Sequence, residues 1–277
     1  MRFGRFSHGA DDVFHGEVDA DVVHVLDRAP WLGGRRTGRY APIAELDHLP
    51  PVLPQTFYAA GYNYAAHNDD AAARGFAGPE LKDHPEPGYR ANSALIGHGA
   101  AIVKPAGVEG RFEAEAELVA VIGRDLIGAS RWEAEDAVFG WTIGNDVSAR
   151  EWQHADRTFY RAKNADTFKP MGPWIETDAD PRSAETIVTI SDREVSRFAT
   201  GDMIFDTFDF IVEITKYSTM RPGDILWMGA RGAVGIAPDD SVGIEITGIG
   251  RLVNPVVGAA PAVTTGTRIS DYQGAIR

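Results

Sequence analysis

Glutamates occupy three alternate positions, Glu113, Glu115 and Glu117, immediately before the apolar run Leu118–Gly123. That run is rich in β-branched residues and ends at a glycine, which predicts a strand. On a strand, side chains two residues apart lie on the same face, about 6.6–6.8 Å from each other along the chain. On a helix, side chains with this spacing would point in different directions. Carboxylates placed in this way repel one another, and a hard divalent cation such as Mg²⁺, Mn²⁺ or Ca²⁺ would offset the repulsion. From the spacing alone, the alternative is an edge strand whose acidic face is solvated.

A histidine and an aspartate, His67 and Asp70, are three residues apart in a segment where a helix is expected to begin near Asn63. Residues three apart are neighbours on one face of a helix. A carboxylate beside an imidazole raises the pKa of the imidazole and fixes its orientation, which suits a general base. A surface ion pair is the alternative when these two residues are taken alone.

Further polar side chains follow the predicted strand 141–143, which leads into Asp146. Arg150 and Gln153 are three residues apart on a predicted helical turn, so they share a face. An arginine presents a planar fork to a carboxylate and a glutamine adds a donor, although an ordinary surface arginine is the alternative. Lys163 precedes a turn in a segment rich in proline and glycine, where it either is solvated or reaches into a site.

The remaining segments predict a protein dominated by strands. Strands are expected, with polar turns between them, over residues 186–190, 210–214, 225–227 and 242–246. A helix is expected over residues 131–139, because Ser130 and Glu133 form a capping-box pattern. The sequence has no regular alternation of strands and helices and no glycine-rich phosphate-binding or nucleophile-elbow motif. We therefore expect a mixed β (α+β) fold, with mixed or antiparallel sheets and peripheral helices.

Residues 1–50 are expected to form a small β-rich N-terminal domain, and residues 51–277 a larger catalytic domain. The N-terminal part has short alternating runs between turns rich in glycine and aspartate. Pro50, Pro51 and Pro54 then form a stiff connection, which is typical of a domain boundary.

The composition of the chain excludes several kinds of binding partner and of chemical site. The formal net charge of −13 argues against nucleic acid or an anionic membrane as a partner. The chain has no cysteine, which excludes disulfides, thiolate metal sites and a cysteine nucleophile. The N-terminus lacks the apolar core of a signal peptide, and no run reaches the ~18 apolar residues of a membrane span. We therefore expect a cytoplasmic protein with neither a membrane nor a nucleic acid as partner.

Taken together, these segments resemble the fumarylacetoacetate hydrolase family, in particular bacterial members of the 2-hydroxyhepta-2,4-diene-1,7-dioate isomerase or acylpyruvate hydrolase type. The resemblance extends over about residues 57–235, and its parts follow the family's order along the chain. The matching segments are Gly61–His67, Glu115–Gly123, Gly144–Gln153, Lys163–Trp174 and Arg221–Asp224.

The resemblance implies a β-sandwich roll of the fumarylacetoacetate hydrolase type, usually a homodimer, with a Mg²⁺ or Mn²⁺ centre that could hold Ca²⁺ in a crystal. The family's metal ligands fall on Glu115, Glu117 and Asp146, and Glu113 lies one step outside this triad. The family's catalytic residues fall on His67, on its acidic partner Asp70 and on Lys163. Its substrate-side residues fall on Arg150 and Gln153.

Two positions depart from the family's pattern. Asp70 is one methylene shorter than the usual glutamate, so its carboxylate needs a bridging water to reach His67. Ala230 stands where the family has a threonine that contacts the substrate, and Arg231 follows it. The methyl group of Ala230 cannot replace the hydroxyl, so we expect an altered substrate at this point.

We therefore expect a metal-dependent enzyme that acts on a small 2-oxo or 1,3-dioxo carboxylic acid. The reaction would be hydrolysis of a C–C bond, or isomerisation or decarboxylation through an enolate that the metal stabilises. A catalytically weak relative that serves as a binding or assembly protein is the alternative, and its basis is Ala230.

Overall fold

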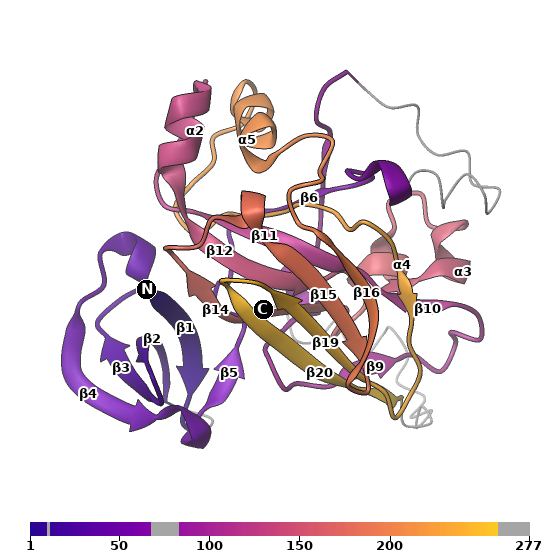
Figure 1. The fold of residues 1–277 in the computed structure, drawn as a ribbon, viewed down its shortest axis with the longest axis horizontal. Helices are drawn as coiled ribbons and strands as arrows, with labels where there is room; N and C mark the ends of the chain where they lie inside the picture. Colours follow the sequence, from indigo (N-terminus) through magenta and orange to yellow (C-terminus); the bar gives the residue numbers. More distant parts are fainter. Residues whose placement is uncertain (10–11, 68–82, 260–277) are drawn as a thin grey trace, which may run out of the picture.

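The computed structural model describes residues 1–9, 12–67 and 83–259, and its strands form several sheets with short helices at the periphery (Figure 1). The largest sheet runs through the whole molecule and is mostly antiparallel. In spatial order its strands are β4 (Arg36–Pro42), β3 (Val22–Leu26), β2 (Val13–Asp19), β1 (Arg2–Ser7), β14 (Lys169–Glu176), β12 (Val138–Asn145), β11 (Ala116–Ile122), β17 (Ile225–Trp227), β6 (Phe57–Ala60) and β7 (Pro87–Tyr89). At its margins, β5 (Asp47–Leu49) pairs with β1, and β8 (Leu95–Ile96) pairs with β14.

Two smaller sheets complete the β structure. The first consists of β16 (Arg193–Ala199), β15 (Glu185–Ile190), β19 (Ser241–Ile246), β20 (Gly250–Gly258) and β9 (Ile102–Lys104). The second consists of β13 (Ser148–Ala149), β10 (Phe112–Ala114) and β18 (Val234–Gly235). The predicted mixed β fold is therefore confirmed.

The N-terminal strands form their own lobe, which lies to one side of the molecule in Figure 1. β1, β2, β3 and β4 are successive antiparallel neighbours around a small apolar core that includes Phe6 and Val23. β1 also pairs with β14 through Arg2 and Glu176, so the lobe is joined to the rest of the chain by sheet hydrogen bonds. The division of the chain into two domains at residue 50 stays a prediction.

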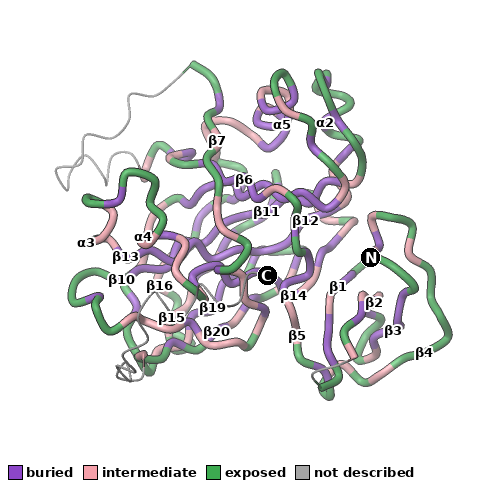
Figure 2. Tube along the Cα trace, turned by 180° about the vertical axis from the view of Figure 1, so that it is seen from behind, coloured by how far each residue is buried: buried purple, intermediate pink, exposed green. Residues whose placement is uncertain are grey.

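Strand β11 lies at the centre of the molecule, and every one of its residues is buried. Leu118 and Ala120 pack into the main core, which the five-stranded sheet and helix α5 (Thr207–Thr215) also line, whereas Val119 and Val121 pack into a separate cluster with Trp227. Figure 2 shows this contrast between the buried central strands and the exposed outer strand β4. The explanation of the glutamate run as a solvated edge strand is therefore wrong.

The predicted single strand over the glutamates is divided in two. Glu113 lies in β10, which pairs with β13 and β18, whereas Glu117 lies in β11 of the large sheet. The chain passes from one sheet to the other at Glu115. Local alternation cannot reveal this change of partner, because it depends on strands far away in the sequence.

The strand predicted over residues 210–214 is wrong, because this segment lies in helix α5 (Thr207–Thr215). Its β-branched residues suggested a strand, but Asp206 and Asp209 form a capping box that begins a helix. Residues three and four apart, such as Phe208, Ile211 and Thr215, bury one face. The predicted capping box at Ser130 is present and begins helix α2 (Arg131–Ala137), which packs beside α5 (Figure 1).

Two further helices, α3 (Arg150–Gln153) and α4 (Tyr160–Asn164), are short and lie near β10, away from α2 and α5 (Figure 1). No helix among the described residues is long and apolar enough to cross a membrane.

Two half-buried histidines, His15 and His98, make the stability of the fold depend on pH. Burial and the positive charge of Arg5 lower the pKa of His15 to about 4, and its ring packs edge-on against Trp31 at 5.3 Å. Burial, with His48 and Arg251 nearby, lowers the pKa of His98 to about 4. Both groups are neutral in the folded protein, whereas the unfolded chain takes up protons below about pH 6.5. Their contribution to stability is therefore complete above pH 6.5 and is lost as the pH falls towards 4.

We predict that His15→Phe reduces this acid sensitivity, because a phenyl ring fills the same space and does not bind a proton. The melting temperature of the variant should fall less than that of the wild type between pH 6.5 and 4. His84→Gln, at an exposed histidine, is the control and should behave as the wild type. Identical losses in His15→Phe and wild type would contradict the prediction.

Candidate metal centre

Three buried carboxylates, those of Glu115, Glu117 and Asp146, converge at one point. One oxygen from each lies within 4.8 Å of the others. The pairing of β11 with β12 produces this arrangement, because Glu117 lies opposite Gly144 and the Asp146 amide donates to the Glu115 carbonyl at 2.9 Å. Gly144 is required there, because a Cβ at this position would lie 2.7 Å from the ring of Trp227.

Basic side chains compensate two of the three carboxylates. The ammonium of Lys163 bridges Glu115 Oε2 at 2.5 Å and Asp146 Oδ2 at 2.7 Å. Arg90 donates to Asp146 Oδ2 at 2.9 Å, and Arg150 pairs with Glu115. Burial opposes ionisation of Glu115, but Arg150 and Lys163 outweigh it and hold its pKa at about 2. Asp146 is likewise held well below its usual pKa, since Arg90, Lys163 and Lys169 overcome the effect of burial.

Glu117 is the uncompensated member of the triad. Its carboxylate accepts a hydrogen bond from the Gly229 amide at 2.8 Å and forms no ion pair within the described part of the chain. Burial and the nearby charges of Asp146 and Glu115 raise its pKa to about 8. A buried set of hard oxygen donors with one uncompensated carboxylate fits a divalent cation of the Mg²⁺ or Mn²⁺ type.

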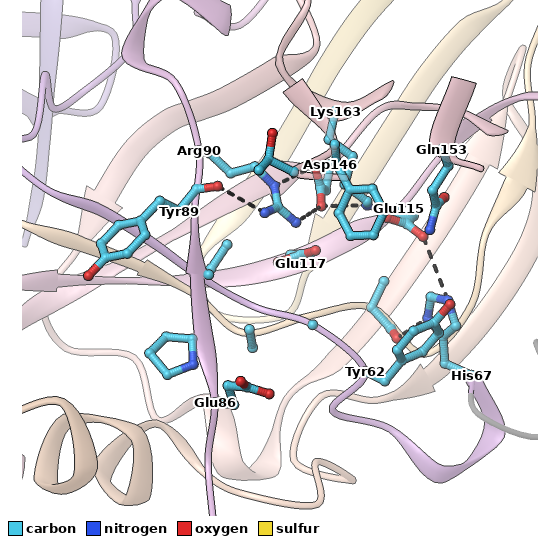
Figure 3. A pocket seen from close by; sticks show the side chains of 18 of the residues that line it. Tyr62, His67, Glu86, Tyr89, Arg90, Glu115, Glu117, Asp146, Gln153 and Lys163 are labelled. Atoms are coloured by element: carbon cyan, nitrogen blue, oxygen red, sulfur yellow. Dashed lines mark hydrogen bonds and ion pairs between the residues drawn. The ribbon is translucent and has the colours of Figure 1, made fainter. Parts of the chain in front are cut away.

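The triad opens into a cavity of about 340 Å³ (Figure 3). Several of the residues around it are aromatic or apolar, including Tyr62, Tyr89, Phe159 and Pro87. The cavity also contains every described residue that the sequence assigned to catalysis or substrate binding: His67, Arg150, Gln153, Lys163 and Ala230. Asp70 lies outside the described residues.

The imidazole of His67 is oriented by the backbone of Ala230. His67 Nδ1 lies 2.8 Å from the Ala230 carbonyl oxygen, which can only accept a hydrogen bond, so Nδ1 carries the proton. In the neutral ring Nε2 is then the basic nitrogen, and it lies 3.7 Å from Glu115 Oε1. The orientation of His67 therefore depends on the backbone carbonyl of residue 230 and not on the side chain of that residue.

Arg150 is bonded to protein groups on three of its nitrogens. Nε donates to Glu113 at 2.6 Å, Nη1 donates to Gln153 at 3.0 Å, and the second arm pairs with Glu115. Glu113, which the sequence left outside the triad, therefore holds Arg150 in place. A direct contact of Arg150 or Gln153 with substrate stays a prediction.

Sequence reasoning missed Arg90 and Lys169. Arg90 directly follows β7, and its role depends on Asp146, which is 56 residues away in the sequence. Lys169 is fully buried at the start of β14, and its ammonium lies 2.6 Å from Asp146 Oδ1. It does not line the cavity, so it reaches Asp146 from within the protein. No local signal distinguishes such a lysine from a solvated one.

A mixed β fold with a convergent carboxylate triad, an oriented histidine and a buried lysine in one cavity defines a protein with a candidate metal-dependent active site. The chain belongs to the fumarylacetoacetate hydrolase family, because the family described as "Fumarylacetoacetate (FAA) hydrolase C-terminal" matches residues 56–257. The family described as "Rv2993c-like, N-terminal" matches residues 1–51.

Two similar proteins cover nearly the whole chain, and a third covers about three quarters of it. Protein Rv2993c of Mycobacterium tuberculosis is 36% identical over 269 residues, which are 93% of this chain and 98% of that protein. The crystal structure of 5-carboxymethyl-2-hydroxymuconate delta-isomerase from Mycobacterium smegmatis is 34% identical, with a TM-score of 0.82, and the match covers 94% of this chain and 100% of that one. The 4-hydroxyphenylacetate degradation bifunctional isomerase/decarboxylase of Salmonella dublin is 33% identical over 73% of this chain and 47% of its own length.

We predict that Lys169→Met destabilises the protein, because Asp146 stays buried and loses one of its counter-charges. The loss should be about 1.5–3 kcal/mol in the free energy of unfolding, the usual range for a hydrogen bond to a charged group, because Arg90 and Lys163 still pair with Asp146. Urea denaturation with chelator present measures it. Lys216→Met removes an exposed lysine that pairs with Glu213 and should cost under about 0.5 kcal/mol. Equal effects of the two substitutions would show that Lys169 does not stabilise Asp146.

Proposed function

We propose that this protein is a divalent-metal-dependent enzyme acting on a 2-oxo or 1,3-dioxo carboxylic acid, with Mg²⁺ or Mn²⁺ held by Glu115, Glu117 and Asp146. The observation that carries the proposal is the buried triad, in which Glu117 has no cationic partner among the described residues, beside the basic Nε2 of His67 in one cavity. A bound divalent ion would supply Lewis-acid stabilisation to the negative charge that develops on the substrate's oxygens.

The chain's own side chains have distinct parts in this proposal. His67, oriented by the Ala230 carbonyl, takes a proton at Nε2: from water in a hydrolysis, or from carbon in an isomerisation. Lys163 and Arg90 line the cavity and both pair with Asp146, so a substrate that enters the cavity can reach these two cations. The aromatic residues Tyr62 and Tyr89 line the cavity and offer apolar surface to the carbon chain of a substrate.

The relatives support chemistry through an enolate. One is named as a delta-isomerase and another as a bifunctional isomerase/decarboxylase. Isomerisation, decarboxylation and C–C hydrolysis share the formation of an enolate, and they differ in whether a proton moves, carbon dioxide leaves or water attacks. The oriented His67 and the triad with its uncompensated Glu117 favour an active enzyme over a catalytically weak binding protein. The cytoplasmic location and the homodimer are further parts of the proposal, and they rest on composition and on the family resemblance.

An activity screen tests the proposal directly. The protein is assayed with Mg²⁺ or Mn²⁺ against acylpyruvates, oxaloacetate and hydroxymuconate-type acids. We expect turnover of at least one of these classes, and we expect chelator to abolish it. Activity that persists after complete removal of divalent ions would contradict the proposal.

We predict that Glu117→Gln abolishes binding of the divalent ion and leaves the fold intact, because glutamine has the shape of the protonated glutamate. Mn²⁺ at 100 times its Kd should stabilise the wild type by about 2.7 kcal/mol and the variant by almost nothing. Thermal denaturation with and without Mn²⁺ measures the difference. Glu135→Gln, at an exposed glutamate of α2, is the control and should keep the full shift. A Mn²⁺-induced shift that survives in Glu117→Gln would exclude Glu117 as a ligand.

We predict that His67→Ala lowers hydrolytic or isomerising turnover by roughly 10²–10⁴-fold, because it removes the general base. The Mn²⁺-induced rise in melting temperature should remain, since His67 is not one of the proposed ligands. A decarboxylation that needs no activated water would tolerate the substitution, so the same variant separates the candidate reactions. An unchanged kcat for hydrolysis would remove His67 from the mechanism.

A further inference from the structure

One cation in the cavity has no partner among the described residues of the protein. Of the basic residues that line the cavity, Arg90, Arg150 and Lys163 are buried or half-buried and pair with carboxylates of the site. Arg157 also lines the cavity, but it is exposed and makes no ion pair or side-chain hydrogen bond within residues 1–9, 12–67 and 83–259. The other arginines at this site stabilise the protein's own carboxylates, whereas the guanidinium of Arg157 remains available to a ligand.

The carboxylates closest to Arg157 in the sequence are already bonded. Asp156 accepts from Arg161 Nη2 at 2.8 Å and from the backbone amides of Arg161 and Ala162. Glu151 accepts from the backbone amides of Glu109 and Gly110. Arg157 lies in the loop between α3 and α4, and this loop holds its exposed side chain at the cavity.

The cavity therefore has two kinds of polar contact for a ligand. The carboxylate triad is buried, while Arg157 is exposed, and the lining also includes the aromatic residues Tyr62, Tyr89 and Phe159. In Figure 3, Tyr89 and Tyr62 lie on opposite sides of the triad. A ligand with a polar head, a short carbon chain and a second anionic group fits this combination. The volume of about 340 Å³ is at the small end for ligand sites and suits a chain of few carbons.

We infer that Arg157 binds a second carboxylate at the far end of the substrate, so that the enzyme selects 2-oxo dicarboxylates over 2-oxo monocarboxylates. The inference rests on the proposed function, which places the 2-oxo acid head at the triad. A guanidinium binds a carboxylate through two parallel hydrogen bonds. A cation at the entrance also attracts an anionic substrate that the protein's net charge of −13 would otherwise repel.

Matched ligands isolate the contribution of the distal carboxylate. 2-Oxopentanoate and 2-oxoglutarate have the same five-carbon chain, and 2-oxohexanoate and 2-oxoadipate have the same six-carbon chain. Within each pair only the last carbon differs: it is a methyl group in the monocarboxylate and a carboxylate in the dicarboxylate. Isothermal titration of each ligand into the protein with saturating Mn²⁺ gives the selectivity as the ratio of the two Kd values.

We expect wild type to bind the better-fitting dicarboxylate about tenfold more tightly than its monocarboxylate partner, as for a charge-assisted contact. Arg157→Ala should weaken dicarboxylate binding about five- to tenfold and change monocarboxylate binding less than twofold. Arg157→Lys keeps the charge but not the fork, so it should recover part of the selectivity. Arg193→Ala removes an exposed arginine of β16 outside the cavity and controls for net charge.

Each result decides the inference. Selectivity that falls in Arg157→Ala but not in Arg193→Ala supports it. Selectivity that is the same in Arg157→Ala and wild type, while both ligands of a pair still bind, overturns the role of Arg157 and leaves the proposed function standing. If no 2-oxo acid binds to the Mn²⁺-loaded wild type, the proposed function fails together with the inference.

Discussion

The pairing of buried carboxylates with buried cations is the constraint on which the rest of this structure depends. Glu113, Glu115, Glu117 and Asp146 are all at most 4% exposed. Burying a charged carboxylate without a partner costs several kcal/mol, so the fold must bring cations to these groups or leave them protonated. It does both, because Glu115 and Asp146 are held ionised by basic residues while burial keeps the pKa of Glu117 at about 8.

The cations that contact Asp146 lie in two different places. Lys169 is fully buried, does not line the cavity and contacts Asp146 together with the carbonyls of Val147 and Phe168. It is a fixed part of the interior. Lys163 and Arg90 contact the same aspartate from the cavity side, where a ligand can reach them. Asp146 therefore has one counter-charge that is enclosed by the protein and two that face the cavity.

The sheet fixes the geometry of this site. β11 is buried on both faces and is held between β12 and β17, which sets the register that places Glu117 and Asp146 close together. The close approach of Trp227 to Gly144 leaves no room for a side chain at that point. The family match and the similar solved structure over most of the chain agree with this architecture. Loops at the cavity, including the one that carries Arg157, are where substrate selection is expected to differ between relatives.

The sequence alone determined the family and the predominance of strands, because these depend on residue types at short, ordered spacings, and the family resemblance then placed the acidic triad on Glu115, Glu117 and Asp146. It also placed His67, Lys163, Arg150, Gln153 and Ala230, whose described side chains or backbone meet around one cavity. Only the tertiary structure decided which groups compensate which charges. Arg90 and Lys163 meet Asp146 across separations of 56 and 17 residues, and Gly229 meets Glu117 across 112. The change of sheet at Glu115 and the helical state of residues 210–214 also depend on distant partners and on burial. Local propensity contains no information about burial of this kind, since the energy of a charged side chain is set by the groups that surround it after folding.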